Sequence, residues 1–183
     1  MTYRQDGNDF WPGPLNANAN SANYGTIDAP TCAEYDKHYK ISSAEVLEFI
    51  EWKACSSDPD CSTSELFPDY TIPTVINEWP AERINIDGTD TYLAPFEDLD
   101  GDGVYEPESG EYPAYDVNQE KDCKNEDILF GDETLWWVFN DNGNIHTESG
   151  SESAIGLEIQ AQAFGFQTND AVSYTHLTLP TIA

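Results

Sequence analysis

Apolar and polar residues alternate most clearly in two segments near the end of the chain. The first, TLWWVFN at 134–140, consists largely of aromatic and β-branched side chains, a composition that favours β-strands. In the second, GLEIQAQAFGF at 156–166, every second residue from Leu157 to Ala163 is apolar, and the residues between them are polar. A period of two places the apolar side chains on one face of a strand. The pattern therefore predicts two β-strands.

A helical period occurs earlier, in ISSAEVLEFIEWKAC at 41–55. Ser42 precedes the apolar positions and Glu45 follows three residues later, which is the spacing of an N-terminal capping box. The next positions on one face recur three and four residues apart, as a helix requires: Val46, Phe49, Ile50 and Lys53. We predict one helix here.

Weaker patterns lie between residues 73 and 94. PTVINEW predicts a second, shorter helix with Pro73 at its first helical position and Pro80 as its end. Residues 84–94 predict a hairpin, with DGTD as the turn between INI and TYLA.

The charge of the chain excludes one class of partner. The 183 residues include 35 acids and seven bases, so the formal net charge is −28. Such a chain repels nucleic acid and anionic membrane surfaces, and its own like charges oppose compaction. The 13% aromatic content argues against disorder. The sequence contains no apolar run of the roughly 18 to 20 residues that a membrane span needs.

The four cysteines indicate an oxidising compartment. Cys55 and Cys61 enclose the short segment SSDPD, and we predict that they form a disulfide. By elimination, Cys32 and Cys123 form a second one. The alternative is a chain with four reduced thiols. No C-x-x-C pair is present, and His38 and His146 are the two histidines of the main body, so the sequence does not favour zinc.

Five spaced motifs carry a family resemblance: TYRQDGNDFWPGPL, TCAEYDKHYKIS, INEWPA, LAPFEDLDGDGVYEPESGEYP and GDETLWWVFNDNGNIHTESGSESAIGLEIQAQAFGF. In this order they resemble the N-terminal region of large secreted surface proteins that use the type IX secretion system and end in a C-terminal sorting domain. The resemblance spans about residues 2–166. It implies export, a β-rich extracellular region and attachment at the cell surface. Because such proteins have a signal peptide and a sorting domain that this sequence lacks, the chain is interpreted as a fragment.

Together these patterns predict the domain organisation. Residues 1–31, rich in Asn, Gly, Pro and Ala, are expected to be irregular and extended, with Trp11 packed onto the domain. Residues 32–171 are expected to form a β-rich domain. Residues 172–183 (VSYTHLTLPTIA) depart from the family pattern and are expected to be a non-native tail, the alternative being a final strand. The predicted fold is mainly β with one or two short α-helices and long irregular loops (α+β, β-rich), an incomplete antiparallel β domain.

A calcium-type loop is predicted at 96–116. Asp98, Asp100 and Asp102 alternate with Leu99 and Gly101, and Gly103 follows, which is the D-x-D-x-D-G opening of a calcium loop. Calcium takes six to eight oxygen ligands, and a tightly turning loop directs every second side chain inward. A glycine at the turn avoids the strain that a residue with Cβ would meet.

The second half of the predicted loop departs from the usual pattern. The Val104 carbonyl oxygen and Glu106 occupy the next ligand positions, but Ser109 replaces the bidentate glutamate at the twelfth position. Pro95 and Pro107 disfavour flanking helices, so an EF-hand switch is not expected. The candidate closing ligands are Glu108, Glu111 and Asp116. A solvated acidic turn without a metal is the alternative.

Other motifs give weaker predictions. The oxygens of NDNGN at 140–144 are a second candidate cation site, although Asn-Gly first of all predicts a turn. LWWVF is either a sugar-stacking platform or core, and core is favoured. His146 is expected to be structural. No metalloprotease, nucleophile-elbow or P-loop motif occurs.

The sequence therefore favours a secreted, non-catalytic, calcium-stabilised structural or adhesive module at the cell surface, whose partners are calcium and a surface glycan or another surface protein. One alternative is an accessory region of an extracellular polysaccharide-acting hydrolase, because glycosidases need only two suitably placed carboxylates. Another is salt adaptation without a specific metal.

Overall fold

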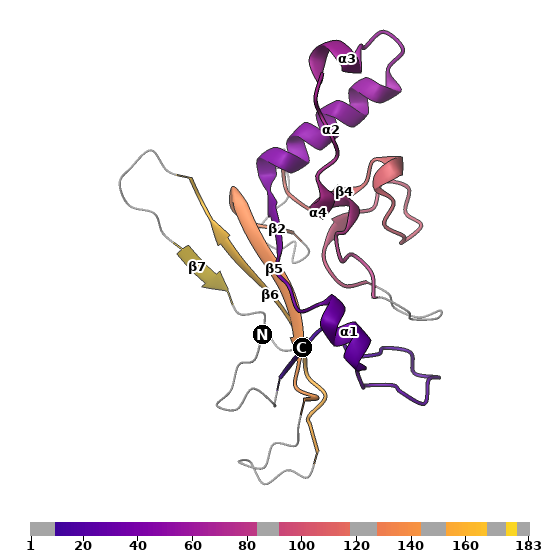
Figure 1. Ribbon diagram of the computed structural model, residues 1–183, viewed down its shortest axis with the longest axis vertical. Coiled ribbons are helices and arrows are strands. Elements are labelled where there is room, and N and C mark those ends of the chain that lie inside the picture. The colour runs from indigo at the N-terminus through magenta and orange to yellow at the C-terminus, as the bar shows by residue number, and fades with distance from the viewer. Residues whose placement is uncertain (1–9, 84–91, 118–127, 144–152, 168–174, 179–183) are drawn as a thin grey trace.

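The computed structural model describes residues 10–83, 92–117, 128–143, 153–167 and 175–178. These residues form a mixed α+β fold whose named strands all pair antiparallel, in an unclosed five-stranded sheet and a separate two-stranded sheet. The predicted β-rich, incomplete antiparallel domain is confirmed. In Figure 1 the long strands β5 and β6 lie beside each other, and α2, α3, α4 and β4 lie above and to the right of them.

The two predicted strands form the centre of the sheet. β5 (Glu133–Asn140) and β6 (Glu158–Gly165) pair along their whole length, from Glu133 opposite Gly165 to Asn140 opposite Glu158. On its other edge, β5 pairs with β1 (Trp11–Pro12) and with β2 (Tyr39–Ser42). Trp11 is thus anchored to the sheet, as the sequence predicts.

Alternation along β5 gives the sheet one core face. Thr134, Trp136, Val138 and Asn140 are buried, whereas the residues between them are partly exposed. Trp136 is 3% exposed and belongs to the main core cluster. The favoured interpretation of LWWVF as core is therefore correct for Trp136.

The predicted helix is α2 (Ser43–Ser57), and its capping box is present. The Ser42 hydroxyl accepts a hydrogen bond from the Glu45 backbone N–H, and the Glu45 carboxylate accepts one from the Ser42 N–H at 2.9 Å. Two N–H groups that a helix start leaves without partners are thereby satisfied. Val46 and Phe49 are fully buried, so α2 covers the core face of the sheet.

Shorter helices connect these elements: α1 (Ala29–Glu34), α3 (Thr63–Leu66) and α4 (Thr74–Asn77). The short helix predicted after Pro73 is α4, but Pro73 is its N-cap rather than its first helical residue, because its backbone is extended (ψ 134°). The segment predicted to be irregular up to residue 31 contains β1 and the start of α1.

The last described segment is a strand. β7 (Thr175–Thr178) pairs with β6 from Gln162 to Gly165. This strand lies within the segment 172–183 that was expected to be a non-native tail, and the origin of that segment stays a prediction. Of the predicted hairpin, residues 84–91 lie outside the described residues, and next to them Glu82 and Tyr92 form an isolated antiparallel bridge.

One of the two predicted disulfides is confirmed. Cys55, in the last turn of α2, is bonded to Cys61, with the two Cα atoms 5.2 Å apart. The predicted Cys32–Cys123 bond is contradicted, because Cys32 has a free thiol in α1; Cys123 lies outside the described residues. An even number of cysteines contains no information on where the sulfurs lie, and pairing by elimination failed for that reason.

None of the described helices has the length and apolarity that crossing a bilayer requires.

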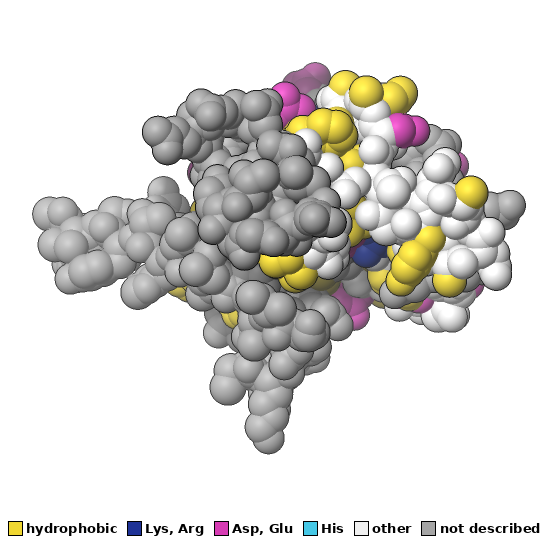
Figure 2. Space-filling model, turned by 90° about the horizontal axis from the view of Figure 1, so that it is seen from below, with side chains coloured by type: hydrophobic (Ala, Val, Ile, Leu, Met, Phe, Trp, Pro, Cys, Tyr) yellow, Lys and Arg dark blue, Asp and Glu magenta, His cyan; other side chains and the backbone are white. Residues whose placement is uncertain are grey.

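On the face drawn in Figure 2, acidic side chains appear at several places near the margin, and basic colour among the described side chains appears in a small central area.

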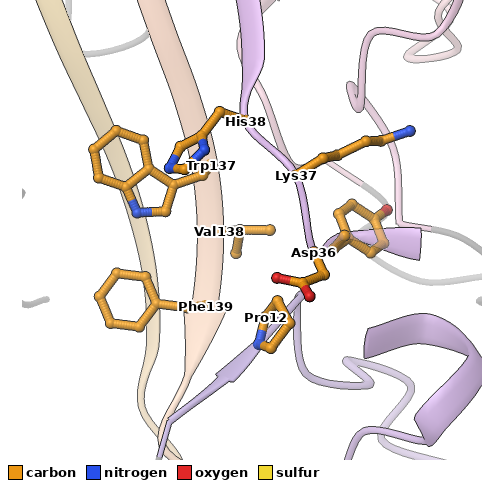
Figure 3. Close-up of a pocket in the computed structure, with 8 residues that line it drawn as sticks. Pro12, Asp36, Lys37, His38, Trp137, Val138 and Phe139 are labelled. Carbon is orange, nitrogen blue, oxygen red and sulfur yellow. The ribbon is translucent and has the colours of Figure 1, made fainter. Parts of the chain in front are cut away.

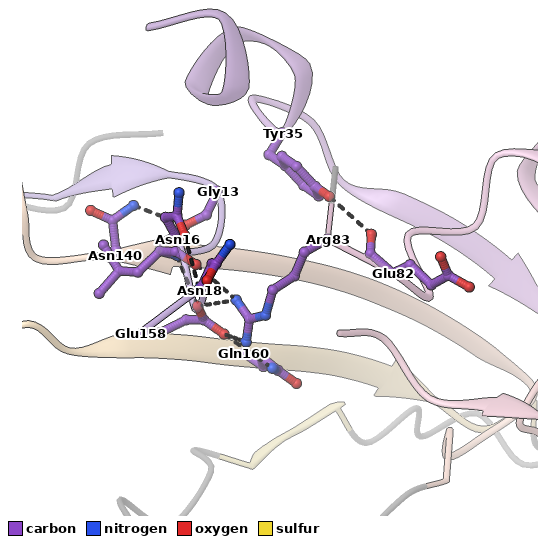
Figure 4. A network of polar contacts seen from close by, with 10 residues as sticks. Gly13, Asn16, Asn18, Tyr35, Glu82, Arg83, Asn140, Glu158 and Gln160 are labelled. Carbon is purple, nitrogen blue, oxygen red and sulfur yellow. Dashed lines mark hydrogen bonds and ion pairs between the residues drawn. The ribbon is translucent and has the colours of Figure 1, made fainter. Parts of the chain in front are cut away.

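A largely buried ion pair ties the N-terminal segment to the sheet (Figure 4). The Arg83 guanidinium donates to the Glu158 carboxylate at 2.7 Å and to the Leu15 carbonyl oxygen at 3.2 Å. Glu158 also accepts from the Leu15 N–H, and the nearby Asn140 side chain donates to the Gly13 carbonyl. The side chains of Arg83 and Glu158 are only 11% and 17% exposed.

This geometry predicts that two similar substitutions lower the free energy of unfolding by different amounts. Glu158→Gln leaves the buried Arg83 guanidinium without its counter-charge and should lower the free energy of unfolding by about 3 kcal/mol. Glu133→Gln breaks the pair with Lys40, whose side chains are 55% and 61% exposed, and should cost under about 0.5 kcal/mol. Urea unfolding of both variants measures the difference, and equal costs would contradict the structural role of Arg83.

Candidate metal centre

The predicted calcium-type loop is a closed structure. β3 (Phe96–Glu97) and β4 (Tyr112–Pro113) pair antiparallel, Phe96 opposite Pro113 and Glu97 opposite Tyr112. Residues 98–111 therefore form a loop whose two ends lie side by side in the β3–β4 pair. The Tyr105 hydroxyl, halfway along, donates to the Ile76 carbonyl oxygen at 2.8 Å and attaches the loop to α4.

Three of the predicted ligand residues come together inside this loop. Asp98, Asp100 and Glu111 each place a carboxylate oxygen so that all three oxygens lie within 4.8 Å of one another. Oxygens of this kind and at this spacing are what a hard divalent cation such as calcium prefers. Asp98 is partly exposed and Asp100 is exposed, so the cluster is open to solvent on one side.

Glu111 is the innermost member, with 1% of its surface exposed. One carboxylate oxygen accepts from the Leu99 N–H at 3.0 Å, and the other accepts from the Glu106 N–H at 2.8 Å. The side chain therefore crosses the loop and joins its two halves. Glu111 is two residues beyond the twelfth position, where the usual bidentate glutamate would stand.

A short 3₁₀ turn, η1 (Pro107–Ser109), precedes the two extra residues, Gly110 and Glu111. After it, Gly110 adopts φ +108°, a left-handed conformation that strains residues with Cβ, and the chain turns back toward Asp98. Gly103, which the sequence singles out for the turn, has φ +79°.

Asp98 is held in its ionised form. Although burial opposes ionisation, backbone N–H groups of Gly101 and Gly103 and the Tyr92 hydroxyl donate to the carboxylate and together lower the pKa of Asp98 below its ordinary value. In turn, burial first and then the Asp98 charge raise the pKa of Tyr92. Tyr92 comes from outside the motif, and no local pattern in the sequence indicates its role.

Other predicted ligand groups lie outside the three-carboxylate cluster. The Asp102 carboxylate accepts from the Val104 N–H, and Val104 is 45% exposed. The Glu106 carboxylate accepts from the Ser109 hydroxyl. Glu108 is exposed, and its backbone carbonyl accepts from Lys53 of α2, a contact that the sequence does not predict. Asp116 is partly buried beyond β4.

The second candidate cation site is used for backbone contacts. Asp141 is fully buried, and its carboxylate accepts from the N–H groups of Ile155, Gly156 and Leu157. The Asn140 side chain donates to Gly13. The Asp141 oxygens thus join the end of β5 to the segment before β6, and Asn140 joins it to the N-terminal segment. Asn144 lies outside the described residues, as does His146.

A small cavity lies where β1 and β2 leave a gap along β5 (Figure 3). Figure 3 shows Trp137 and Phe139 on one side of it and Pro12 and Asp36 on the other. Its volume is about 40 Å³, which is room for a few waters rather than a sugar ring. Trp137 packs edge-on against His38, with ring centroids 5.2 Å apart.

In comparisons with known proteins, the chain matches no protein-family model, no curated protein and no solved structure. The resemblance to surface proteins of the type IX secretion system therefore stays a prediction.

The hydrogen bonds to Asp98 predict a specific pH dependence. Because its folded-state pKa is lowered, Asp98 contributes stability that is complete above its unfolded pKa, near 3.8, and is lost as the pH falls through the lower folded value. Tyr92→Phe removes one donor and should raise the folded pKa toward the unfolded one. Carboxyl-carbon NMR titration measures both midpoints, with a peptide of residues 96–103 as the unfolded reference. A wild-type midpoint at or above that of the peptide would contradict this account.

Proposed function

We propose that this chain is a non-catalytic, calcium-stabilised structural or adhesive module of a secreted cell-surface protein. The observation that supports it most is the convergence of Asp98, Asp100 and Glu111 in a loop closed by β3 and β4. A structural calcium site needs oxygen ligands fixed by the chain on both sides of the ion. Here the start and the end of one loop supply them.

The balance of charge supports a cation at this place. Carboxylates within about 4–6 Å raise one another's pKa and oppose folding. Backbone N–H groups offset part of this repulsion at Asp98 and Glu111, but each supplies only a partial charge. A divalent ion between the carboxylates reverses the sign of the interaction. The same ion reduces the net charge of −28, which destabilises the compact chain.

Glu111 is the proposed ligand that closes the loop around the ion. The sequence alone left this role open among Glu108, Glu111 and Asp116. The other carboxylate ligands of the proposed site are Asp98 and Asp100. Because the loop lacks the bidentate glutamate at its twelfth position, we expect a dissociation constant of about 10⁻⁴ to 10⁻³ M, the range of extracellular modules. Such a site fills where calcium is millimolar.

The Cys55–Cys61 disulfide supports a location outside the cytosol. Structural disulfides persist in oxidising compartments and are rare where thiols are kept reduced. An extracellular or cell-surface location agrees with a weak calcium site, since both need the same environment. The proposed adhesive partner is a surface glycan or another surface protein.

Calcium should stabilise the folded chain. At about ten times its dissociation constant it adds about 1.4 kcal/mol to the free energy of unfolding, which raises Tm by about 3–6 °C for a chain of this length. Scanning calorimetry in calcium, magnesium and sodium chloride at equal ionic strength measures the effect. We expect the largest rise with calcium, because magnesium demands a smaller octahedral site. An equal rise with sodium would indicate salt adaptation and would contradict the proposal.

Asp100→Asn should remove most of this calcium-dependent rise in Tm. The asparagine keeps an oxygen that can accept the Asp102 N–H, so the turn is retained while one ligand charge is lost. The matched control is Glu51→Gln on the exposed side of α2, which removes the same charge away from the loop. If both variants respond to calcium like the wild type, the ion does not bind at Asp100.

A further inference from the structure

A second feature, separate from the acidic loop, is an open cleft of about 510 Å³ beside α2. The N-terminal half of α2 forms one wall, through Glu45 and Glu48. The segment from Leu66 to Pro73, which leads from α3 to α4, forms the other. A cleft of this size falls in the usual range of ligand sites.

The walls of the cleft are held in place. Phe49, Trp52, Tyr70 and Phe67 form a chain of ring contacts, with successive centroids 6.3, 5.4 and 6.1 Å apart. The Cys55–Cys61 disulfide joins the end of α2 to the segment before α3. Phe67 and Tyr70 are part of the lining, and Leu66 at the rim is 66% exposed. The cleft therefore has an aromatic wall and an apolar rim that exist before any ligand binds.

Three of the residues that line the cleft are acidic: Glu45, Glu48 and Asp69. Glu45 is engaged in the capping box, whereas Glu48 and Asp69 have no ion pair or hydrogen bond within the described part of the chain. None of the residues lining the cleft is basic. The negative potential also affects Tyr70: burial first, then the charges of Glu48 and Glu45, raise the pKa of Tyr70 to about 12.

We propose that this cleft binds a lysine or arginine side chain presented by a basic segment of another protein. Such a side chain combines an aliphatic stem with a cationic head. The stem suits Leu66 and the ring of Phe67, and the head suits the carboxylates of Glu48 and Asp69 beside an aromatic face. Charge complementarity selects this occupant, since a chain of net charge −28 repels acidic partners and attracts basic ones.

The test must separate the cleft from the general attraction of an acidic protein for cations. The probe is a short, end-blocked, fluorescein-labelled peptide of alternating lysine and alanine, and its binding is followed by fluorescence anisotropy. In about 0.15 M salt the Debye length is about 8 Å, so charges outside the cleft contribute little. Glu48→Gln should weaken binding by about fivefold. Glu34→Gln, an exposed position on α1 away from the cleft (Figure 1), removes the same charge and should leave binding nearly unchanged.

A second variant tests the aromatic wall without changing charge. Phe67→Ala should weaken binding of the peptide. The helix content measured by circular dichroism should stay unaltered. Equal weakening by Glu48→Gln and Glu34→Gln would show that only the net charge attracts the peptide, and the proposal would be wrong. Absence of peptide binding to the wild type in this salt would overturn it as well.

Discussion

A carboxylate buried in an acidic loop is the constraint on which the rest of this structure depends. Glu111 is removed from water together with its charge, and a buried charge is stable only when it is compensated. The N–H groups of Leu99 and Glu106 give partial compensation and at the same time fix the shape of the loop. The neighbouring Asp98 and Asp100 add charge of the same sign, so a bound cation is the simplest way to complete the balance.

This loop is not an appendage of the fold. Its base is the β3–β4 pair, Tyr105 connects it to α4, and Lys53 connects it to α2. Because α2 and α4 both cover the core beside Trp136, a change in the loop is transmitted to elements that hold the domain together. The proposed stabilisation by calcium follows from these connections and does not require a conformational switch.

Local patterns in the sequence predicted the elements that local interactions define. The capping box of Ser42 and Glu45, the alternation in β5 and β6 and the short spacing of Cys55 and Cys61 all depend on residues within a few positions of one another. The strand β2 was missed because Tyr39–Ser42 has its partner about ninety residues away in β5. No short pattern contains that information.

The residues of the candidate site also divide into those that a local pattern identifies and those that depend on more distant contacts. The D-x-D-x-D-G motif identified Asp98 and Asp100, whose geometry arises within the motif itself. Glu111 could be named only as one of three closing ligands, because its position depends on the η1 turn and on Gly110. Tyr92 lies before the motif, and its contact with Asp98 depends on how two separate segments pack.

The most direct test of the central claim is anomalous diffraction from a crystal of this chain grown in millimolar calcium. The account predicts an anomalous peak within about 2.3–2.6 Å of carboxylate oxygens of Asp98, Asp100 and Glu111. An ordered loop with no peak among these three side chains would contradict it.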